Sequence, residues 1–222
     1  MAASTVAVPS SARLVVATHN RKKLVELLAI LRARPGLDSL PDDAVVSAGD
    51  LGAPEPVEDG VTFGENALIK ARALARATGL PAVADDSGLS VDVLGGAPGI
   101  FSARWAGRHG DDVANLGLLL AQLGDVRDEH RGAAFVCAAA LVTPDGREEV
   151  CLGEMPGVLV REPRGTHGFG YDPILVPTEQ PTTPDGRPGT RTSAELSPDE
   201  KNAISHRGKA LRALAPEIAA AL

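Results

Sequence analysis

Short apolar runs and helical repeats alternate through the first part of the chain. The run at 13–18 predicts a buried strand, and leucines spaced three or four positions apart over 24–31 predict a helix with one apolar face. A second strand is predicted at 43–48, before a loop rich in proline, glycine and acidic residues at 49–60. Residues 1–12 show no such periodicity and are expected to form a disordered leader.

A helix with clear ends is predicted next. Thr62 and Glu65 have the spacing of a capping box, and Gly79 is the kind of residue that ends a helix in the left-handed conformation. The apolar positions between them recur on one helix face, at Phe63, Ala67, Ala71 and Leu74. A strand at 81–85 is expected to follow.

The second half of the chain predicts longer extended segments. A helix at about 112–123 precedes two extended segments, 132–143 and 148–161, which a hairpin turn signal joins. The segment 178–192 is rich in proline, threonine and glycine and is expected to be a mobile loop. Ser197 then begins a helical C-terminal region with a second capping box.

This order of elements indicates the α/β class. Strands alternate with helices early and pair as a hairpin later, which favours a mixed β-sheet flanked by helices. Because neither a repeat nor a linker composition interrupts residues 13–222, they are predicted to fold as a single domain.

Composition narrows the class of protein. The chain has 222 residues and a net charge of −7, which argues against bulk attraction to nucleic acid or to an anionic membrane. Its longest apolar run, 133–142, is too short to cross a bilayer, and the first residues lack the pattern of a secretory signal. A cytoplasmic protein is therefore expected. Cys137 and Cys151 could pair, although free thiols are the expectation in that compartment.

Two adjacent carboxylates give the most informative chemical signal. Asp85 and Asp86 end an apolar strand and are followed by Ser87 and Gly88. Because successive strand side chains point to opposite faces, one carboxylate can hold a hard cation while the other ties down the loop. Such oxygen ligands, beside a glycine that admits a ligand, suit magnesium and phosphate. The alternative is an ordinary turn, in which these residue types are common.

A cationic loop follows the first strand. It consists of Thr18, His19, Asn20, Arg21, Lys22 and Lys23. A helix start after a sharp loop directs backbone N–H groups and the positive end of the helix dipole toward one point. Asn20 can cap that helix, and Lys23 can reach a phosphate. The alternative is a capping asparagine followed by solvated basic side chains.

The helix after Thr62 offers another cation. Asn66 and Lys70 are four positions apart and share a polar helix face. Lys70 could meet a phosphate, and Glu58 lies in the acidic loop before this helix. The alternatives are a surface lysine and a solvated loop carboxylate.

An aromatic residue between two glycines marks a third cluster. Phe169 is followed by Gly170, and glycines clear space above a ring face on which a flat base can stack. Tyr171 adds a second aromatic in a chain that is only 3% aromatic, and Asp172 can accept hydrogen bonds from ring N–H groups. The alternative is an aromatic plug among glycine turns.

A fourth cluster lies near the C-terminus. Lys201, Ser205, His206 and Arg207 offer mostly hydrogen-bond donors, which favours a ligand edge that carries carbonyl groups. The alternative is a set of cations that complement a helix end.

Together these clusters resemble one family, the inosine/xanthosine triphosphate pyrophosphatases. The matching stretches are ATHNRKK, TFGENALIKA, ADDSGLSVDVLGGAPGIFSAR, GFGYDP and AEL…K…ISHRGKA, in the expected order over about 13–212. The resemblance implies an elongated fold with two lobes around a central substrate cleft, and a homodimer. It also implies Mg²⁺-dependent hydrolysis of a deaminated purine nucleoside triphosphate (ITP, dITP or XTP) to the monophosphate and pyrophosphate, which cleanses the nucleotide pool.

The resemblance also implies roles for individual residues. Asp86 is implied to be the catalytic base and a metal-linked carboxylate, and Glu58 a second metal carboxylate. Matches to triphosphate contacts include Asn20, Lys23, Lys70 and Ser87. Matches to the base pocket are Phe169, Gly170, Tyr171, Asp172, Lys201, His206 and Arg207. Two features depart from the family pattern: His19, where many members have a small residue, and the length of 178–192.

Donors at the pocket edge are expected to select the base. Arg207 and Lys201 suit the 6-keto oxygen of hypoxanthine or xanthine, and a site of this kind can reject a 6-amino base by roughly four orders of magnitude. Two other hypotheses compete with this reading: a Maf-type pyrophosphatase for other modified or pyrimidine nucleotides, and a nucleotide-binding regulator without catalysis. The presence of both Glu58 and Asp86 argues against the regulator.

Overall fold

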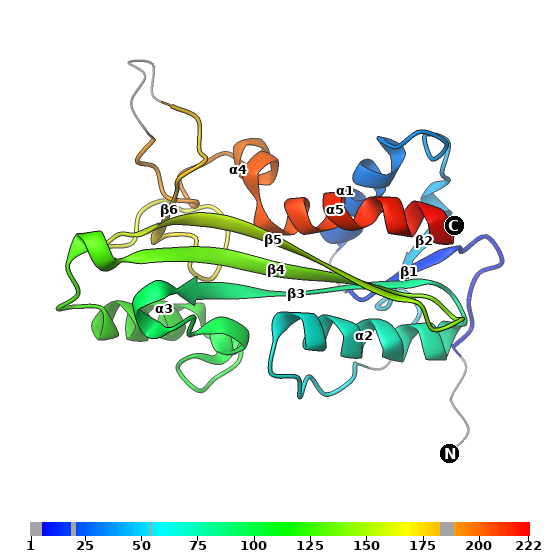
Figure 1. The fold of residues 1–222 in the computed structure, drawn as a ribbon, viewed down its shortest axis with the longest axis horizontal. Coiled ribbons are helices and arrows are strands. Elements are labelled where there is room, and N and C mark those ends of the chain that lie inside the picture. Colours follow the sequence, from blue (N-terminus) through cyan, green and yellow to red (C-terminus); the bar gives the residue numbers. More distant parts are fainter. Residues whose placement is uncertain (1–5, 19–20, 54, 183–188) are drawn as a thin grey trace. The chain divides into compact units, whose positions relative to one another are not determined.

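The chain divides into two compact units, each assembled from separate stretches of sequence. The computed structural model describes residues 6–18, 21–53, 55–182 and 189–222 (Figure 1). Unit 1 comprises Met1–Asp86, Ala138–Gly153 and Lys209–Leu222, and unit 2 comprises Ser87–Cys137 and Glu154–Gly208.

The strands form one six-stranded sheet in the order β2-β1-β3-β4-β5-β6. Their bounds are β1 Leu14–Val16, β2 Val45–Ser47, β3 Ala82–Val91, β4 Gly132–Val142, β5 Glu148–Leu159 and β6 Leu175–Pro177. β1 is parallel to β2 and to β3, whereas β5 and β6 are antiparallel, with Val158 opposite Val176. The sheet is therefore mixed, which confirms the predicted fold class.

Five α-helices accompany the sheet in the described part of the chain. They are α1 Arg21–Arg32, α2 Phe63–Thr78, α3 Asp112–Gln122, α4 Pro198–Ile204 and α5 His206–Ala221. Short 3-10 helices lie at Asp42–Ala44, Asp92–Leu94, Gly99–Arg104 and Asp128–His130. No helix in the described ranges is long and apolar enough to cross a membrane.

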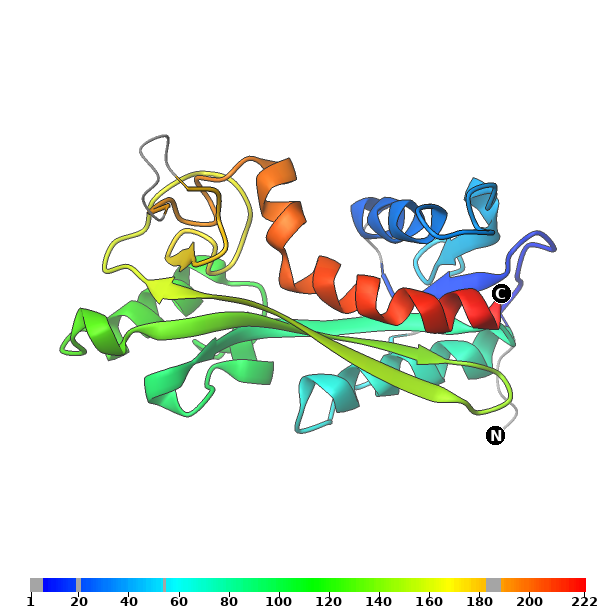
Figure 2. The same cartoon turned by 45° about the horizontal axis from the view of Figure 1, so that its top comes forward.

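Small side chains build the core of unit 1. Here α2 covers one face of the strands and α5 lies on the opposite face (Figures 1 and 2). The buried face of α2 meets alanines of the strands, a cluster that includes Ala67, Ala71, Leu74, Ala82, Ala84, Ala138 and Ala140. Methyl-sized side chains let helix and sheet approach closely, so the apolar stripe predicted for this helix is confirmed.

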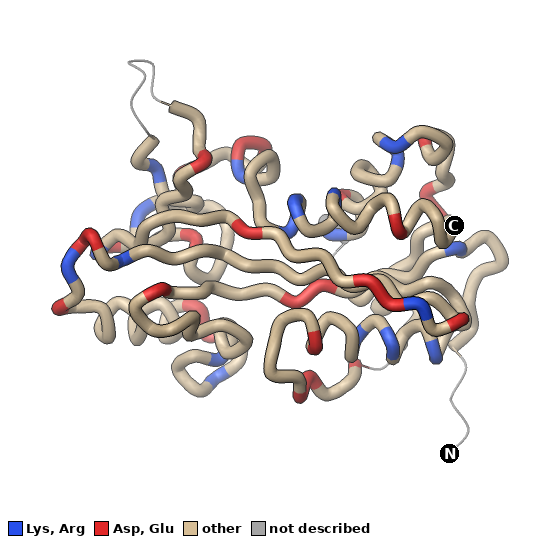
Figure 3. The backbone as a smooth tube through the Cα atoms, in the orientation of Figure 1, with Lys and Arg blue, Asp and Glu red and all other residues tan. Residues whose placement is uncertain are grey.

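Larger side chains build the core of unit 2. Its buried cluster includes Leu89, Val91, Leu119, Leu123, Phe135, Met155, Leu159, Tyr171, Ile174 and Leu175. Arg131 is also buried, at 1% exposure, and donates to the carbonyls of Leu159, Leu123 and Val160. β4, which contributes to both cores, carries no charged residue and is a continuous tan tube in Figure 3.

Local capping signals predicted the helix ends correctly. The Thr62 hydroxyl accepts the Glu65 amide, although the Glu65 carboxylate reaches back to the amide of Val61 rather than of Thr62. Gly79 ends α2 with φ of 70°, in the left-handed region. Ser197 forms the complete capping box of α4.

The prediction that a strand ends at the two aspartates is wrong. β3 runs on to Val91, so Asp85 and Asp86 lie within a strand. β3 lies in the sheet between β1 and β4, which keeps the backbone extended. Both carboxylates have side-chain partners: Lys23 binds Asp85, and Asn66 and Lys70 bind Asp86.

Other differences are smaller. The C-terminal region is two helices separated at Ser205, and β6 was not predicted. In the expected leader, the amide of Val6 donates to the carbonyl of Ala77 at 3.1 Å, so residues 6–12 have contacts within unit 1. Cys137 and Cys151 do not form a disulfide, as expected.

Candidate active site

A lysine between two carboxylates forms the centre of the polar cluster of unit 1. The Lys70 ammonium lies 3.3 Å from a Glu58 oxygen and 3.4 Å from an Asp86 oxygen. The side chains of Lys70 and Asp86 are each 16% exposed, and that of Glu58 is 37% exposed. The structure thus brings together the two carboxylates predicted as metal ligands, and Lys70 is not the surface lysine of the alternative interpretation.

Asn66 ties the acidic loop to the strand. It is 2% exposed, its amide nitrogen donates to Asp86 at 3.2 Å, and its oxygen accepts the amide of Gly60 at 2.9 Å. A side chain at Gly60 would meet Asn66 and Glu65 at 2.7 Å, which explains the glycine. The helical spacing of Asn66 and Lys70 was visible in the sequence, but this bridging role required the fold.

The environment of Asp86 favours its protonated form. Burial raises the pKa of the Asp86 carboxyl above its ordinary value, and the negative charge of Glu58 adds to the rise. The Lys70 charge and the hydrogen bonds from Asn66 and Lys70 act in the opposite direction but do not cancel it. The result is a carboxylate that is more basic than usual and therefore suited to accepting a proton.

The neighbouring carboxylate has a different partner, as the alternation of a strand predicted. Asp85 is 7% exposed, and the ammonium of Lys23 on α1 lies 2.9 Å from it. The pair joins α1 to β3, so Asp85 anchors a helix rather than the following loop. The ammonium of Lys23 is paired with Asp85 in this structure, and its predicted phosphate contact stays a prediction.

The remaining residues of the cationic loop are only partly described. Thr18 is buried, at 7% exposure. His19 and Asn20 lie outside the described residues, as do the side chains of Arg21 and Lys22, so their predicted phosphate contacts stay predictions.

The carboxylate pair fits the magnesium ion that the family resemblance implies. Glu58 and Asp86 each place a hard oxygen donor beside the Lys70 ammonium. A divalent cation near Asp86 would lower its raised pKa and favour the ionised carboxylate. Over the described ranges, no group of three or more His, Cys, Asp or Glu side chains could hold a metal. A carboxylate pair is nevertheless enough for Mg²⁺, which commonly completes its shell with water and substrate phosphates.

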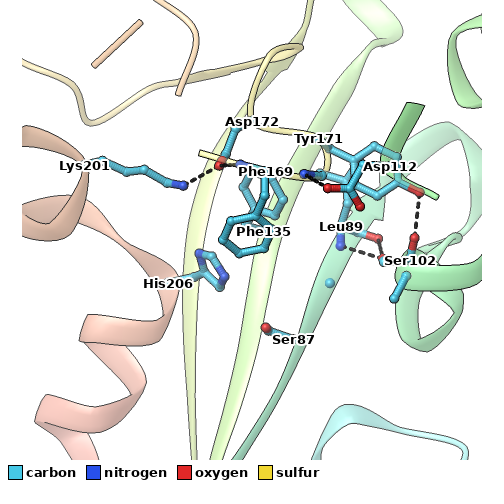
Figure 4. A pocket seen from close by; sticks show the side chains of 13 residues that line it. Ser87, Leu89, Ser102, Asp112, Phe135, Phe169, Tyr171, Asp172, Lys201 and His206 are labelled. Carbon is cyan, nitrogen blue, oxygen red and sulfur yellow. Dashed lines mark hydrogen bonds and ion pairs between the residues drawn. The ribbon is translucent and has the colours of Figure 1, made fainter. Parts of the chain in front are cut away.

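Unit 2 contains a pocket walled by aromatic rings (Figure 4). Its lining residues are Ser87, Gly88, Leu89, Ser102, Ala103, Asp112, Phe135, Phe169, Gly170, Tyr171, Asp172, Lys201 and His206. Phe169 is 77% exposed, and the Lys201 ammonium lies 5.5 Å from the centre of its ring. The imidazole of His206 stacks on Phe135, with centroids 5.2 Å apart and planes 18° apart.

Two carboxylates fix the loop that carries Phe169. Asp172 is 2% exposed, and its Oδ2 atom accepts the Phe169 amide at 2.9 Å and the Lys201 ammonium at 2.5 Å. Asp112, the first residue of α3, accepts the amide of Gly170 at 2.8 Å. Asp172 was expected to accept hydrogen bonds from a base; in this structure its Oδ2 atom is bound to the protein's own donors.

Tyr171 has a structural role. It is 4% exposed, and its hydroxyl donates to the carbonyl of Ser102 at 2.9 Å. Burial, and then the charge of Asp112, raise the pKa of its phenol, so the hydroxyl remains a donor. Tyr171 also lines the pocket, so its predicted substrate contact stays a prediction.

The other predicted base-pocket residues divide into two groups. Lys201, His206 and Gly170 line the pocket, and so does Ser87, which was expected at the phosphates. Arg207 is not among the described lining residues. Sequence reasoning missed Phe135, Ser102 and Asp112, because each lies in an element whose pattern shows ordinary core or capping positions.

The chain is similar to known proteins over nearly its whole length. The model of the Ham1 family matches residues 14–217. The chain belongs to the Ham1 family. A Streptomyces coelicolor protein named dITP/XTP pyrophosphatase is 62% identical over 206 residues, which cover 93% of this chain and 96% of the relative. A Bifidobacterium animalis subsp. lactis protein of the same name is 56% identical, covering 92% of this chain and 96% of the relative.

Solved structures of this family share the fold. The crystal structure of a nucleoside-triphosphatase / dITP/XTP pyrophosphatase from Mycobacterium abscessus is 53% identical, with a TM-score of 0.73, and the match covers 92% of this chain and 99% of that one. A HAM1 protein from Coxiella burnetii is 40% identical, with a TM-score of 0.78, over 95% of this chain and 100% of that one.

Proposed function

We propose that the protein is a Mg²⁺-dependent pyrophosphatase that hydrolyses ITP, dITP and XTP to the monophosphate and pyrophosphate. The observation that carries the proposal is the half-buried Asp86 carboxylate, held with Glu58 beside Lys70, with its pKa raised chiefly by burial. Its near relatives, the Streptomyces and Bifidobacterium proteins, are named dITP/XTP pyrophosphatases and match almost the whole chain. The role in the cell would be to remove deaminated purine nucleotides.

At the phosphate end, Asp86 is the proposed base. Its raised pKa suits it to orient an attacking water and to accept a proton from it. Lys70, whose ammonium is largely buried, would stabilise negative charge that develops on the phosphate oxygens. Magnesium, held by Glu58 and Asp86, would supply charge neutralisation and orientation of the phosphate chain when bound. Asn66 keeps the Asp86 carboxylate in place through its hydrogen bond.

At the base end, the unit 2 pocket is proposed to hold the purine ring. The exposed face of Phe169 offers a stacking surface, and Lys201 offers donors beside it. An ammonium group suits the 6-keto oxygen of hypoxanthine or xanthine, whereas an adenine amino group would place donor against donor. The pocket thereby supports selection for deaminated purines against adenine nucleotides.

Assembly and location complete the proposal. A homodimer rests on the family resemblance, and a cytoplasmic location rests on the composition and on the apolar pattern of the sequence. Sedimentation of the purified protein at micromolar concentration would test the dimer.

A substrate panel tests the activity. Purified protein with Mg²⁺ is incubated with dITP, XTP, ATP, GTP and a modified pyrimidine triphosphate, and released pyrophosphate is measured. The expected result is release from dITP and XTP that stops with EDTA and returns with excess Mg²⁺. Absence of pyrophosphate from both dITP and XTP would refute the proposal, and preference for the pyrimidine would favour a Maf-type activity instead.

A further inference from the structure

The helix that carries Lys201 has little packing of its own. α4 spans seven residues, Pro198–Ile204; none of them is fully buried, and Ile204 at its C-terminal end packs against the unit 2 core. A helix of this length is marginal in isolation, so its position depends on side-chain contacts at its ends. One end is fixed by the Ser197 capping box, in which Glu200 accepts the amide of Ser197 at 2.9 Å.

Arg191 holds the same glutamate from outside the helix. Its two terminal nitrogens lie 3.0 and 2.7 Å from the two carboxylate oxygens of Glu200, which is the bidentate geometry that fixes orientation as well as distance. The hydrogen bond from Arg191 lowers the pKa of Glu200 to about 2, so the pair stays ionised at neutral pH.

The backbone at Arg191 is itself anchored. Gln180 is 5% exposed; its amide nitrogen donates to the carbonyls of Pro177 and Arg191, and its oxygen accepts the Arg191 amide. These bonds close the base of the long 178–192 segment beside β6. Arg191 therefore projects from a fixed point rather than from a free loop.

Glu200 is followed directly by Lys201, whose ammonium meets Asp172 at 2.5 Å in the aromatic pocket. We infer that Arg191 is a positioning residue for base selection. Its ion pair with Glu200 fixes the position of α4, and α4 in turn holds the Lys201 ammonium beside Asp172 and the Phe169 ring. The kinetic test of this inference rests on the proposed function.

Kinetics of Arg191→Gln test the inference. The expected result is a KM for dITP that rises by about three- to tenfold, the scale of one charge-assisted pair, while kcat changes less than about twofold. The preference for dITP over dATP falls in parallel. Glu200→Gln should behave alike, because glutamine preserves the capping box but not the ion pair. Arg161→Gln, which removes another surface arginine–carboxylate pair of unit 2, is the matched control.

A double variant tests whether Arg191 affects base preference through Lys201 or independently of it. If Arg191 acts through Lys201, Arg191→Gln adds little to the loss of preference in Lys201→Met. Additive losses, or a wild-type preference in either single variant, would overturn the inference while leaving the proposed activity intact. Loss of dITP and XTP hydrolysis in the wild type would instead refute the function.

Amide exchange gives a reading that needs no turnover. Arg191→Gln and Glu200→Gln should speed hydrogen exchange of the α4 amides, whereas Arg161→Gln should not. Unchanged α4 exchange in Arg191→Gln contradicts the inference whatever the substrate proves to be.

Discussion

The acidic cluster of unit 1 and the aromatic pocket of unit 2 are carried by different kinds of secondary structure. Asp86, Asn66 and Lys70 belong to a ten-residue strand and a sixteen-residue helix that bury an extensive apolar face. Phe169 and Lys201 belong to a glycine-rich turn and a short helix that buries none of its residues. Hydrogen bonds to Asp112, Asp172 and Glu200 add to the core contacts of Tyr171 and Ile204 there.

The proposed catalytic residues therefore lie on long regular elements, and the residues proposed to select the base lie on a turn and a short helix. Charged groups that act on phosphate must keep their spacing, and long regular elements provide it. A pocket that chooses among bases is formed by loops, whose side chains can change without disturbing the core. Substitutions in the first region should therefore change turnover, and substitutions in the second should change binding and selectivity.

The largest effect is expected from Asp86→Asn. It removes the proposed base while keeping the shape of the side chain, and kcat should fall by roughly 100- to 10,000-fold. Nucleotide binding, measured by calorimetry, should largely persist. Turnover within tenfold of the wild type would show that Asp86 is not the base.

The same variant makes a prediction about stability. Because the folded pKa of Asp86 is raised, the fold favours its protonated form: the associated stability is present at low pH and is lost as pH rises through that pKa. At pH 7.5 without metal, Asp86→Asn should therefore melt no lower than the wild type. The explanation would be contradicted if Asp86→Asn had a clearly lower Tm than the wild type at pH 7.5 and the two Tm values did not approach each other at low pH.

The next effect is expected from Lys70→Met. Loss of the ammonium should lower kcat by roughly 100-fold or more, as for removal of a charge-stabilising donor. Since the Lys70 charge lowers the pKa of Asp86, its removal should also move the acid limb of the kcat/KM profile to higher pH. If the acid limb stays in place or moves to lower pH, the Lys70 charge does not lower the pKa of the group that controls it.

Phe169→Ala should affect binding more than turnover. Loss of a base–aromatic stack is worth roughly 1–3 kcal/mol, so KM for dITP should rise by about 5- to 150-fold. Phe101→Ala is the matched control, because Phe101 is also exposed, at 50%, but does not line the pocket. Equal KM values for the two variants would show that Phe169 does not stack on the base.

The smallest effect is expected from Tyr171→Phe. It deletes the hydroxyl that donates to Ser102 and should lower the free energy of unfolding by about 0.5–1.5 kcal/mol. Urea denaturation measures this change, and KM should stay within about twofold of the wild type. A large rise in KM with unchanged stability would give Tyr171 a direct substrate role.

Most of the secondary structure, and the kinds of residue at the site, could be predicted from short-range patterns in the sequence. Helical periodicity, the Thr62 and Ser197 caps and the glycine at 79 are short-range signals, so α2 and α4 began where the pattern predicted. Glu58, Asp86, Phe169 and Lys201 each lie in a short stretch that resembles one family, and the resemblance implied their roles.

The environment of those residues depends on packing between elements that are far apart in the chain. Whether Asp86 is basic depends on its burial and on charges from Glu58 and Lys70, which come from other elements. The pocket gathers side chains from positions as distant in sequence as Phe135 and His206. Burial, electrostatic environment and the pairing of distant residues arise only when the chain is packed, so no local pattern could predict that Tyr171 is structural or that Arg191 grips α4.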